Sequence, residues 1–243
     1  MDANFLRSSL IAHRGLHNKD IPENSISAFK EAIKNNYIIE LDIHLLKDGN
    51  IVVFHDDNLK RMTSIDKKIK DTTYEEIKNL KLNNTNNYIP LLSDVLKIVD
   101  GRVPLLIELK YDNKVGKLED KLISIMKDYK GLYAYQSFSP LSLIYLKKHI
   151  INIPRGLLVT NYKNSKINII KKLFLKNMLL NFIVKPDFIS VNYKYLNSKK
   201  IKKLRNNKLI LTWTIKNNND LNRVKDLCDN YIFENIGNGG TKE

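Results

Sequence analysis

The sequence predicts an α/β fold in which eight parallel strands close into a barrel surrounded by helices, a (β/α)8 barrel. Three observations support this prediction. The chain has 243 residues, a length that suits one such domain. Apolar, β-rich runs alternate with helical patterns along the whole length. Finally, no Gly/Ser/Pro-rich linker or short repeat divides the sequence, so we expect a single domain over residues 1–243.

Eight segments are predicted strands because they are short, apolar and rich in β-branched or aromatic residues. They are 8–12, 38–46, 104–109, 132–138, 153–159, 187–193, 209–215 and 230–236. Helical patterns lie between them, at 25–35, 91–99, 115–129, 140–148, 165–182, 198–206 and 218–228. In the first of these helices Ile26, Phe29 and Ile33 recur at spacings of three and four, and Asn24 or Ser25 is the natural N-cap.

One polar segment interrupts the alternation of strands and helices. Residues 56–90 are rich in Asn and separate the second predicted strand from the third. We expect them to form a small insertion over one mouth of the barrel. The alternative architecture, an open doubly wound sheet, is disfavoured because the sequence lacks the Gly-rich loop that binds dinucleotides.

The chain is strongly basic, with 41 Lys and Arg against 26 Asp and Glu and a formal net charge of +15. Lys outnumbers Arg by 34 to 7, and there are 30 Asn, a skew that low-GC codon usage explains as well as selection for phosphate binding. Because base readout and bidentate phosphate contacts favour Arg, we expect no nucleic-acid partner. Residues 161–208 alone carry a net charge of +12. This pattern favours a solvated basic face, with peripheral contact to an anionic membrane as the alternative.

Cysteine content and hydropathy suggest where the protein acts. The single cysteine, Cys228, excludes an internal disulfide framework and a Cys-based zinc cluster. Residues 1–10 lack the apolar region of a signal peptide, and no stretch approaches the roughly 18 apolar residues that span a bilayer. We therefore expect a cytoplasmic protein, with membrane association as the alternative. The oligomeric state stays open at this point.

Three carboxylates lie at the ends of two predicted strands, where the active sites of such barrels are found. Glu40 and Asp42 are two residues apart, so they face the same side of their strand, and Glu108 ends the next barrel strand. Such a cluster is an oxygen-rich site for one divalent cation, Mg²⁺ or Ca²⁺. Without a cation, repulsion inside the barrel would raise the pKa of at least one of them.

Two histidines and an arginine accompany the carboxylates. His13 and Arg14 follow the first predicted strand directly, and His55 follows the apolar run 51–54. Each residue taken alone has an ordinary structural explanation. Their joint placement favours a site for metal-assisted chemistry on a phosphate. His44 shares the inward face of Asp42, which makes it a weaker alternative ligand.

These motifs together resemble the glycerophosphodiester phosphodiesterase family. The resemblance spans nearly the whole chain in the expected order and is most specific in the first half. The matching segments are Ala12-His13-Arg14-Gly15, Pro22-Glu23-Asn24-Ser25, Glu40-Leu41-Asp42, Val52-Val53-Phe54-His55-Asp56, Glu108-Leu109-Lys110, Gln136-Ser137-Phe138 and Trp213-Thr214.

The resemblance implies a TIM barrel with a small insertion after the second strand. It also implies metal-dependent hydrolysis of small-molecule glycerophosphodiesters to an alcohol and sn-glycerol 3-phosphate, a step in lipid and glycerol metabolism. The roles it implies are His13 and His55 as the acid–base pair, Glu40, Asp42 and Glu108 as metal ligands, and Arg14, Lys110 and Trp213 in substrate binding.

Three residues depart from the family pattern. The last strand commonly ends in Thr-Asp, where this chain has Glu234-Asn235, and Lys216 replaces a common Asn. These changes bear on substrate preference.

Two alternative functions remain. The apolar, lysine-flanked segment 171–185 suggests a lysophospholipase D-type hydrolase that acts on lysophospholipids at a membrane surface, although an ordinary barrel helix explains it more simply. A remote alternative is a non-catalytic protein that binds polyanions through residues 161–208.

Overall fold

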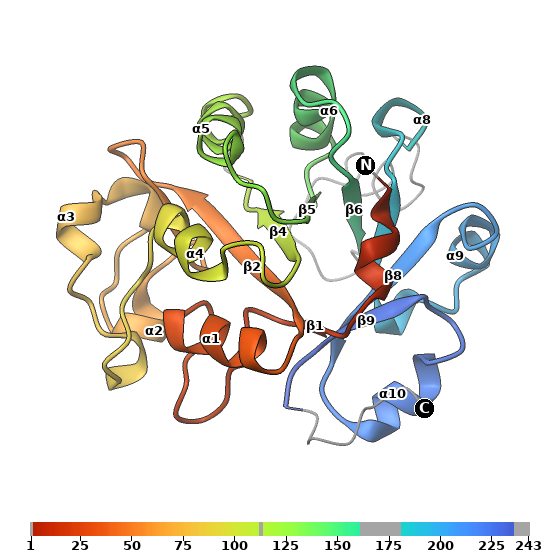
Figure 1. Ribbon diagram of the computed structural model, residues 1–243, viewed down its shortest axis with the longest axis horizontal. Helices are drawn as coiled ribbons and strands as arrows, with labels where there is room; N and C mark the ends of the chain where they lie inside the picture. Colours follow the sequence, from red (N-terminus) through yellow and green to blue (C-terminus); the bar gives the residue numbers. More distant parts are fainter. Residues whose placement is uncertain (1, 112–113, 161–180, 236–243) are drawn as a thin grey trace.

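The computed structural model describes residues 2–111, 114–160 and 181–235 (Figure 1). Eight parallel strands form a closed barrel, because the first strand pairs with both the second and the last. This arrangement confirms the predicted (β/α)8 TIM barrel. In their order around the barrel the strands are β1 (Ile11–Ala12), β2 (Ile38–Leu45), β4 (Leu105–Leu109), β5 (Tyr133–Ser137), β6 (Arg155–Val159), β7 (Phe188–Asn192), β8 (Leu209–Ile215) and β9 (Asn230–Phe233).

The helices lie around the strands (Figure 1). The first begins after Ser25, whose hydroxyl accepts a hydrogen bond of 3.1 Å from the backbone N–H of Ala28, so Ser25 is the N-cap. The described helices of the barrel are α1 (Ile26–Lys34), α4 (Leu92–Val99), α5 (Lys117–Met126), α6 (Pro140–His149), α8 (Asn181–Val184), α9 (Lys199–Leu204) and α10 (Asn218–Val224).

Two apolar layers stabilise the barrel. The larger one lies between the strands and the helices outside them. The smaller one fills the amino-terminal end of the barrel, where η1 (Ala3–Arg7), a 3₁₀ helix that the sequence pattern did not predict, inserts Leu6 among strand residues. A Cβ on Gly156 would lie 2.0 Å from the ring of Phe188, so this packing requires glycine on β6. The site therefore has to lie at the opposite, carboxyl end of the strands.

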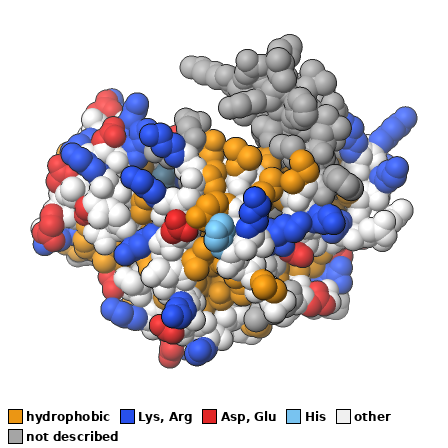
Figure 2. Space-filling view, turned by 90° about the horizontal axis from the view of Figure 1, so that it is seen from above, with side chains coloured by type: hydrophobic (Ala, Val, Ile, Leu, Met, Phe, Trp, Pro, Cys, Tyr) orange, Lys and Arg blue, Asp and Glu red, His pale blue; other side chains and the backbone are white. Residues whose placement is uncertain are grey.

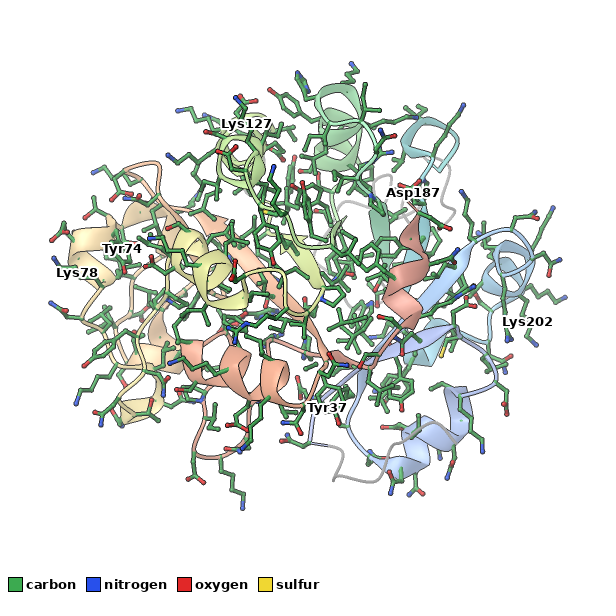
Figure 3. The ribbon with its side chains drawn as sticks, viewed as in Figure 1. Tyr37, Tyr74, Lys78, Lys127, Asp187 and Lys202 are labelled. Carbon is green, nitrogen blue, oxygen red and sulfur yellow. The ribbon has the colours of Figure 1, made fainter. Side chains whose placement is uncertain are left out.

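The predicted insertion after the second barrel strand is present. It begins with β3 (Ile51–Val53), ahead of the predicted start at residue 56, and β3 pairs antiparallel with β2. The insertion lies beside α1 and α4 (Figure 1), and its placement over one mouth of the barrel stays a prediction. Figure 3 shows Tyr74 and Lys78 at its outer edge. Its short helices surround an apolar cluster of their own. They are α2 (Lys60–Thr63), η2 (Ile69–Asp71), α3 (Tyr74–Ile77) and η3 (Leu82–Asn84).

Two predictions concern residues 161–180, which lie outside the described part of the chain. They are most of the helix predicted over 165–182 and most of the lysine-flanked segment 171–185. In the described part of the basic region, four exposed lysines lie on α9, and Figure 3 shows Lys202 at the outer edge of the molecule. Figure 2 shows Lys and Arg side chains at several separate places on the face in view. None of the described helices is long and apolar enough to cross a membrane.

Candidate active site

The three predicted metal-binding carboxylates meet at the carboxyl end of neighbouring strands. Glu40 and Asp42 lie on β2, and Glu108 on β4 stands opposite Asp42 in the strand pairing. All three are buried, and one oxygen of each lies within 4.8 Å of the other two. Oxygens that bind one Mg²⁺ or Ca²⁺ lie about 2.0–2.6 Å from the ion, so this spacing fits a shared cation.

Charge in this cluster is only partly compensated. Burial raises the pKa of Glu40 well above its usual range, and repulsion by Asp42 and Glu108 adds to the rise. Burial acts on Asp42 in the same direction, but Lys110 and Arg14 outweigh it and hold the pKa of Asp42 well below its usual range. The Nζ of Lys110 lies 2.8 Å from Asp42 Oδ1 and 2.5 Å from Glu108 Oε1. The rise in the pKa of Glu40 agrees with the expected effect of crowding, with burial as the larger cause.

A tight turn after β1 aims Arg14 at the carboxylates. Arg14 has φ 55° and Gly15 has φ 78°, and a Cβ on Gly15 would lie 2.9 Å from Ala28 of α1. The turn therefore needs glycine for both its conformation and its close packing. The backbone N–H of Arg14 donates to Glu40 Oε2 at 3.0 Å, and its Nε lies 3.3 Å from Asp42 Oδ2.

A network of charged side chains connects Arg14 to His55. Arg14 Nη1 donates to Glu23 at 2.7 Å, and Arg61 binds Glu23 at 2.7 Å and Asp56 at 2.6 Å. Asp56 in turn lies 2.6 Å from Nδ1 of His55. Because a carboxylate only accepts, Nδ1 carries the proton and Nε2 is left for proton transfer. The insertion thus supplies both His55's partner Asp56 and the bridging Arg61.

His13 is held by a carboxylate from the last strand. Its Nδ1 bonds to Glu234, and its Nε2 lies 3.9 Å from Glu40 Oε2. Glu234 also pairs with Lys216 at 2.6 Å and lies 3.9 Å from His17 Nε2. Burial lowers the pKa of His13, although the hydrogen bond to Glu234 opposes that change. Each of the two predicted catalytic histidines therefore has its own carboxylate.

Four residues near the carboxylates were not assigned a role from sequence. Glu234 and Lys216 both depart from the family pattern. Glu234 bonds to His13, a contact that depends on closure of the barrel, and Lys216 pairs with Glu234. Asn24 Nδ2 donates to Asp42 at 2.9 Å, and Gln136 Nε2 to Glu40 at 3.4 Å. Asn24 and Gln136 belong to the matching motifs, which is the signal that could have identified them.

The remaining two candidates lie apart from the carboxylate cluster. Trp213 on β8 packs edge-on against Phe138, with ring centroids 5.7 Å apart. Its buried Nε1 has no hydrogen-bond partner among the described residues. His44 bonds through Nε2 to the carbonyl of His55 at 3.1 Å. In the described part of the chain, His44 is not a member of the group that could hold a cation.

The sequence profile of the glycerophosphoryl diester phosphodiesterase family matches residues 13–234. The chain belongs to this family. As a family member it is a phosphoric diester hydrolase, which favours an enzyme over a non-catalytic polyanion-binding protein. The matched range runs from His13 to Glu234, the two residues that the hydrogen bond at the barrel mouth joins.

Similar proteins agree with this membership. A glycerophosphodiester phosphodiesterase of Caldanaerobacter subterraneus subsp. tengcongensis is 34% identical over 165 residues, which cover 63% of this chain and 67% of that protein. A human lysophospholipase D is 33% identical over 135 residues, covering 50% of this chain and 42% of that protein. The solved structure of an Oleispira antarctica phosphodiesterase, in complex with the product sn-glycerol-3-phosphate, has the same fold. Its TM-score is 0.77 at 21% identity, with 93% of this chain and 92% of that chain covered.

Proposed function

We propose that this family member hydrolyses glycerophosphodiesters to an alcohol and sn-glycerol 3-phosphate, in lipid and glycerol metabolism, using one divalent cation. The observation that carries the proposal is the buried group of Glu40, Asp42 and Glu108, with oxygens within 4.8 Å of one another beside two cationic side chains. The name of the 34% identical relative and the product bound to the Oleispira antarctica enzyme support the choice of substrate.

In this proposal Glu40, Asp42 and Glu108 hold the cation. A site made of carboxylates alone suits the hard cations Mg²⁺ and Ca²⁺. When bound, the cation supplies positive charge that stabilises the negative charge developing on the phosphoryl oxygens.

Arg14 and Lys110 supply the protein's own positive charge to the phosphate. Burial lowers the pKa of Lys110, but Asp42 and Glu108 outweigh it and hold that pKa above its usual value, so Lys110 stays charged. The charged side chains of Arg14 and Lys110 both lie against the carboxylate cluster, so they can neutralise a bound phosphodiester monoanion. We propose that they bind its non-bridging oxygens and that Trp213 contacts the glycerol.

His13 and His55 carry out the proton transfers. One takes a proton from the attacking oxygen, and the other gives a proton to the alcohol as its bond to phosphorus breaks. Each histidine has Nδ1 on a carboxylate, so Nε2 is the nitrogen that exchanges protons. Burial lowers the pKa of both, which favours the neutral form that a general base needs. Either assignment of acid and base balances the reaction.

Release of sn-glycerol 3-phosphate tests the proposal. Glycerophosphocholine, glycerophosphoethanolamine and glycerophosphoglycerol are incubated with the protein and Mg²⁺ or Ca²⁺, then with a chelator. We expect turnover that the chelator stops and added cation restores, and that His13→Ala abolishes. His149→Ala, an exposed histidine on α6, is the matched control and should retain activity. Turnover of none of the three, or turnover insensitive to both chelator and His13→Ala, would overturn the proposal.

A second candidate substrate is a lysophospholipid, because the 33% identical human relative is a lysophospholipase D. The same site would then act at a membrane surface. Turnover of lysophosphatidylcholine, together with sedimentation with anionic vesicles at low salt, would favour this substrate. If the protein stays in the supernatant and does not hydrolyse lysophosphatidylcholine, a lysophospholipid substrate is excluded.

A further inference from the structure

A pocket of about 830 Å³ opens beside the carboxylate cluster, between the β2–β3 hairpin of the insertion and the start of α5. It shares Lys110 with the active site, and two more of its lining residues lie close in sequence to site residues. Lys110, which contacts the metal-binding carboxylates, lines the pocket directly. His44 lies two residues after Asp42, and Asp57 lies two residues after His55. A molecule held at the carboxylates could therefore extend into this pocket, whose size falls within the roughly 300–1,000 Å³ of small-molecule sites.

The lining of the pocket is basic. Six lysines face three acidic residues, an excess of three positive charges. The lysines are Lys47, Lys68, Lys70, Lys110, Lys114 and Lys117, and the acids are Asp48, Asp57 and Glu119.

Two of the three acids are engaged elsewhere. Asp48 accepts backbone N–H bonds from Tyr74 at 2.8 Å and Asn50 at 3.1 Å. Glu119 is 2% exposed and accepts the N–H of Gly116 at 2.7 Å. The carboxylates of Asp48 and Glu119 therefore bind backbone N–H groups of the pocket wall.

Most of the lysines, by contrast, are available to a ligand. Within the described ranges, four of them have no carboxylate at ion-pair distance. These are Lys47, Lys68, Lys114 and Lys117, all of them exposed. Lysine-rich walls of this kind attract anions into a cleft that low-dielectric protein encloses.

The position of the pocket assigns it to one half of the substrate. In the closed barrel order, β4 and β8 are separated by three strands on either side, so they stand opposite each other. Lys110 follows β4, whereas Trp213, the proposed glycerol contact, lies on β8. A phosphodiester between them would direct its glycerol toward β8 and its alcohol toward the pocket.

We propose that this pocket binds the alcohol half of the substrate and that the preferred alcohol carries its own negative charge, such as a second phosphate. This inference rests on the proposed function of the adjoining site. Water adds to phosphorus, the bond from phosphorus to the alcohol oxygen breaks, and the alcohol leaves with a proton. The charged group on the alcohol is unchanged, and its contribution is to binding and orientation.

Two substrates that differ by one phosphate test this inference. They are sn-glycero-3-phosphoinositol and sn-glycero-3-phosphoinositol 4-phosphate, assayed with the cation that supports turnover. We expect kcat/KM to be about tenfold higher for the 4-phosphate, since several exposed charge pairs each contribute modestly. The triple variant Lys68→Gln, Lys114→Gln, Lys117→Gln should remove that advantage and leave the unphosphorylated substrate within about twofold.

A matched variant separates the pocket from the overall charge of the protein. Lys30→Gln, Lys127→Gln, Lys202→Gln makes the same change in net charge at exposed lysines elsewhere, and Figure 3 shows Lys127 and Lys202 at the periphery. This variant should keep the preference for the 4-phosphate. Equal kcat/KM for both substrates in the unaltered protein, or equal loss in both triple variants, would overturn the inference.

Binding of inositol 4-phosphate, measured by calorimetry, tests the proposed pocket independently of catalysis. We expect binding that the pocket variant loses and the matched variant keeps, and no binding to the unaltered protein would overturn it. If glycerophosphocholine is hydrolysed but the second phosphate confers neither affinity nor rate, only this inference fails. If no phosphodiester is hydrolysed while inositol 4-phosphate binds through the pocket lysines, only the proposed function fails.

Discussion

Glu234 and His13, 221 residues apart, share a hydrogen bond at the mouth of the barrel. Closure of the sheet makes this possible, because β1 pairs with β9 and each residue directly follows its strand. The carboxylate fixes the proton on Nδ1 of His13, and Lys216 balances the charge of Glu234 at 2.6 Å. Two of the three residues at which this chain departs from its family pattern are therefore linked to a predicted catalytic histidine, Glu234 directly and Lys216 through Glu234.

Removing the carboxylate of Glu234 should lower kcat. We expect Glu234→Gln to reduce kcat roughly 10- to 100-fold with little change in KM, because the orientation and tautomer of His13 are no longer fixed. Glu234→Asp should recover part of the loss. Steady-state kinetics measure the split, and the ¹⁵N chemical shifts of His13 report the tautomer. A rise in KM at constant kcat would show that Glu234 binds substrate instead.

Cation binding should reverse the effect of Glu40→Gln on stability. Without cation, this substitution relieves a buried and repelled carboxyl, so the variant should be at least as stable as the unaltered protein. With cation at a hundredfold excess over its Kd, the unaltered protein should gain about 2.7 kcal/mol and the variant much less. Thermal unfolding with chelator, Mg²⁺ and Ca²⁺ measures both. Equal stabilisation of the two proteins would contradict the carboxylate site.

The Glu23–Arg61–Asp56 network should stabilise the fold in a pH-dependent way. Burial opposes ionisation, but Arg61 holds the pKa of Glu23 below its usual value and that of Asp56 at about 2. A depressed carboxyl pKa contributes stability above the unfolded pKa of about 4 and loses it as pH falls through the folded value. Arg61→Met should therefore cost roughly 1 kcal/mol at neutral pH, and this difference should shrink between about pH 4 and pH 2.

Urea unfolding at several pH values measures that difference. Lys60→Met, which removes an exposed ion pair with Asp66, is the control and should change the free energy of unfolding by only a few tenths of a kcal/mol. A constant difference between the Arg61 variant and the unaltered protein at all pH values would contradict the assignment of the network.

Two glycines with similar backbone angles should respond differently to alanine. Gly15 has φ 78° and would place a Cβ 2.9 Å from Ala28, whereas Gly49 has φ 82° and open space around it. Gly49→Ala should cost about 1 kcal/mol from backbone strain alone, and Gly15→Ala roughly 2–4 kcal/mol because packing adds to it. Gly15→Ala should also lower activity, because it moves Arg14. Chemical denaturation compares the two, and equal costs would contradict the packing argument.

The order of elements and the carboxylate cluster were predictable from sequence for a physical reason. Buried parallel strands read as short apolar runs, and the parallel order alone makes β2 and β4 neighbours. That adjacency brings Glu108 opposite Asp42 without further information. The first helix was also predictable, because Ser25, its N-cap, precedes apolar residues at regular helical spacing.

Other features depend on contacts that local patterns do not encode. The insertion has its own core, but Leu59, Ile69 and Leu82 are scattered among polar residues with no helical or strand period. The 3₁₀ helix at the amino terminus is fixed by the barrel interior that it fills. The role of Glu234 follows from barrel closure alone, which is why it first stood out as a departure from a motif.

Anomalous diffraction from crystals soaked in Mn²⁺ and sn-glycerol 3-phosphate tests the central claim most directly. We expect one peak about 2.0–2.6 Å from oxygens of Glu40, Asp42 and Glu108, with the phosphate beside it and His13 and His55 on opposite sides of the phosphorus. A second group, His13, His17 and Glu234, also has ligand atoms within 4.8 Å of one another. A peak at that group, with none at the three carboxylates, would show that Glu40, Asp42 and Glu108 are not the metal ligands.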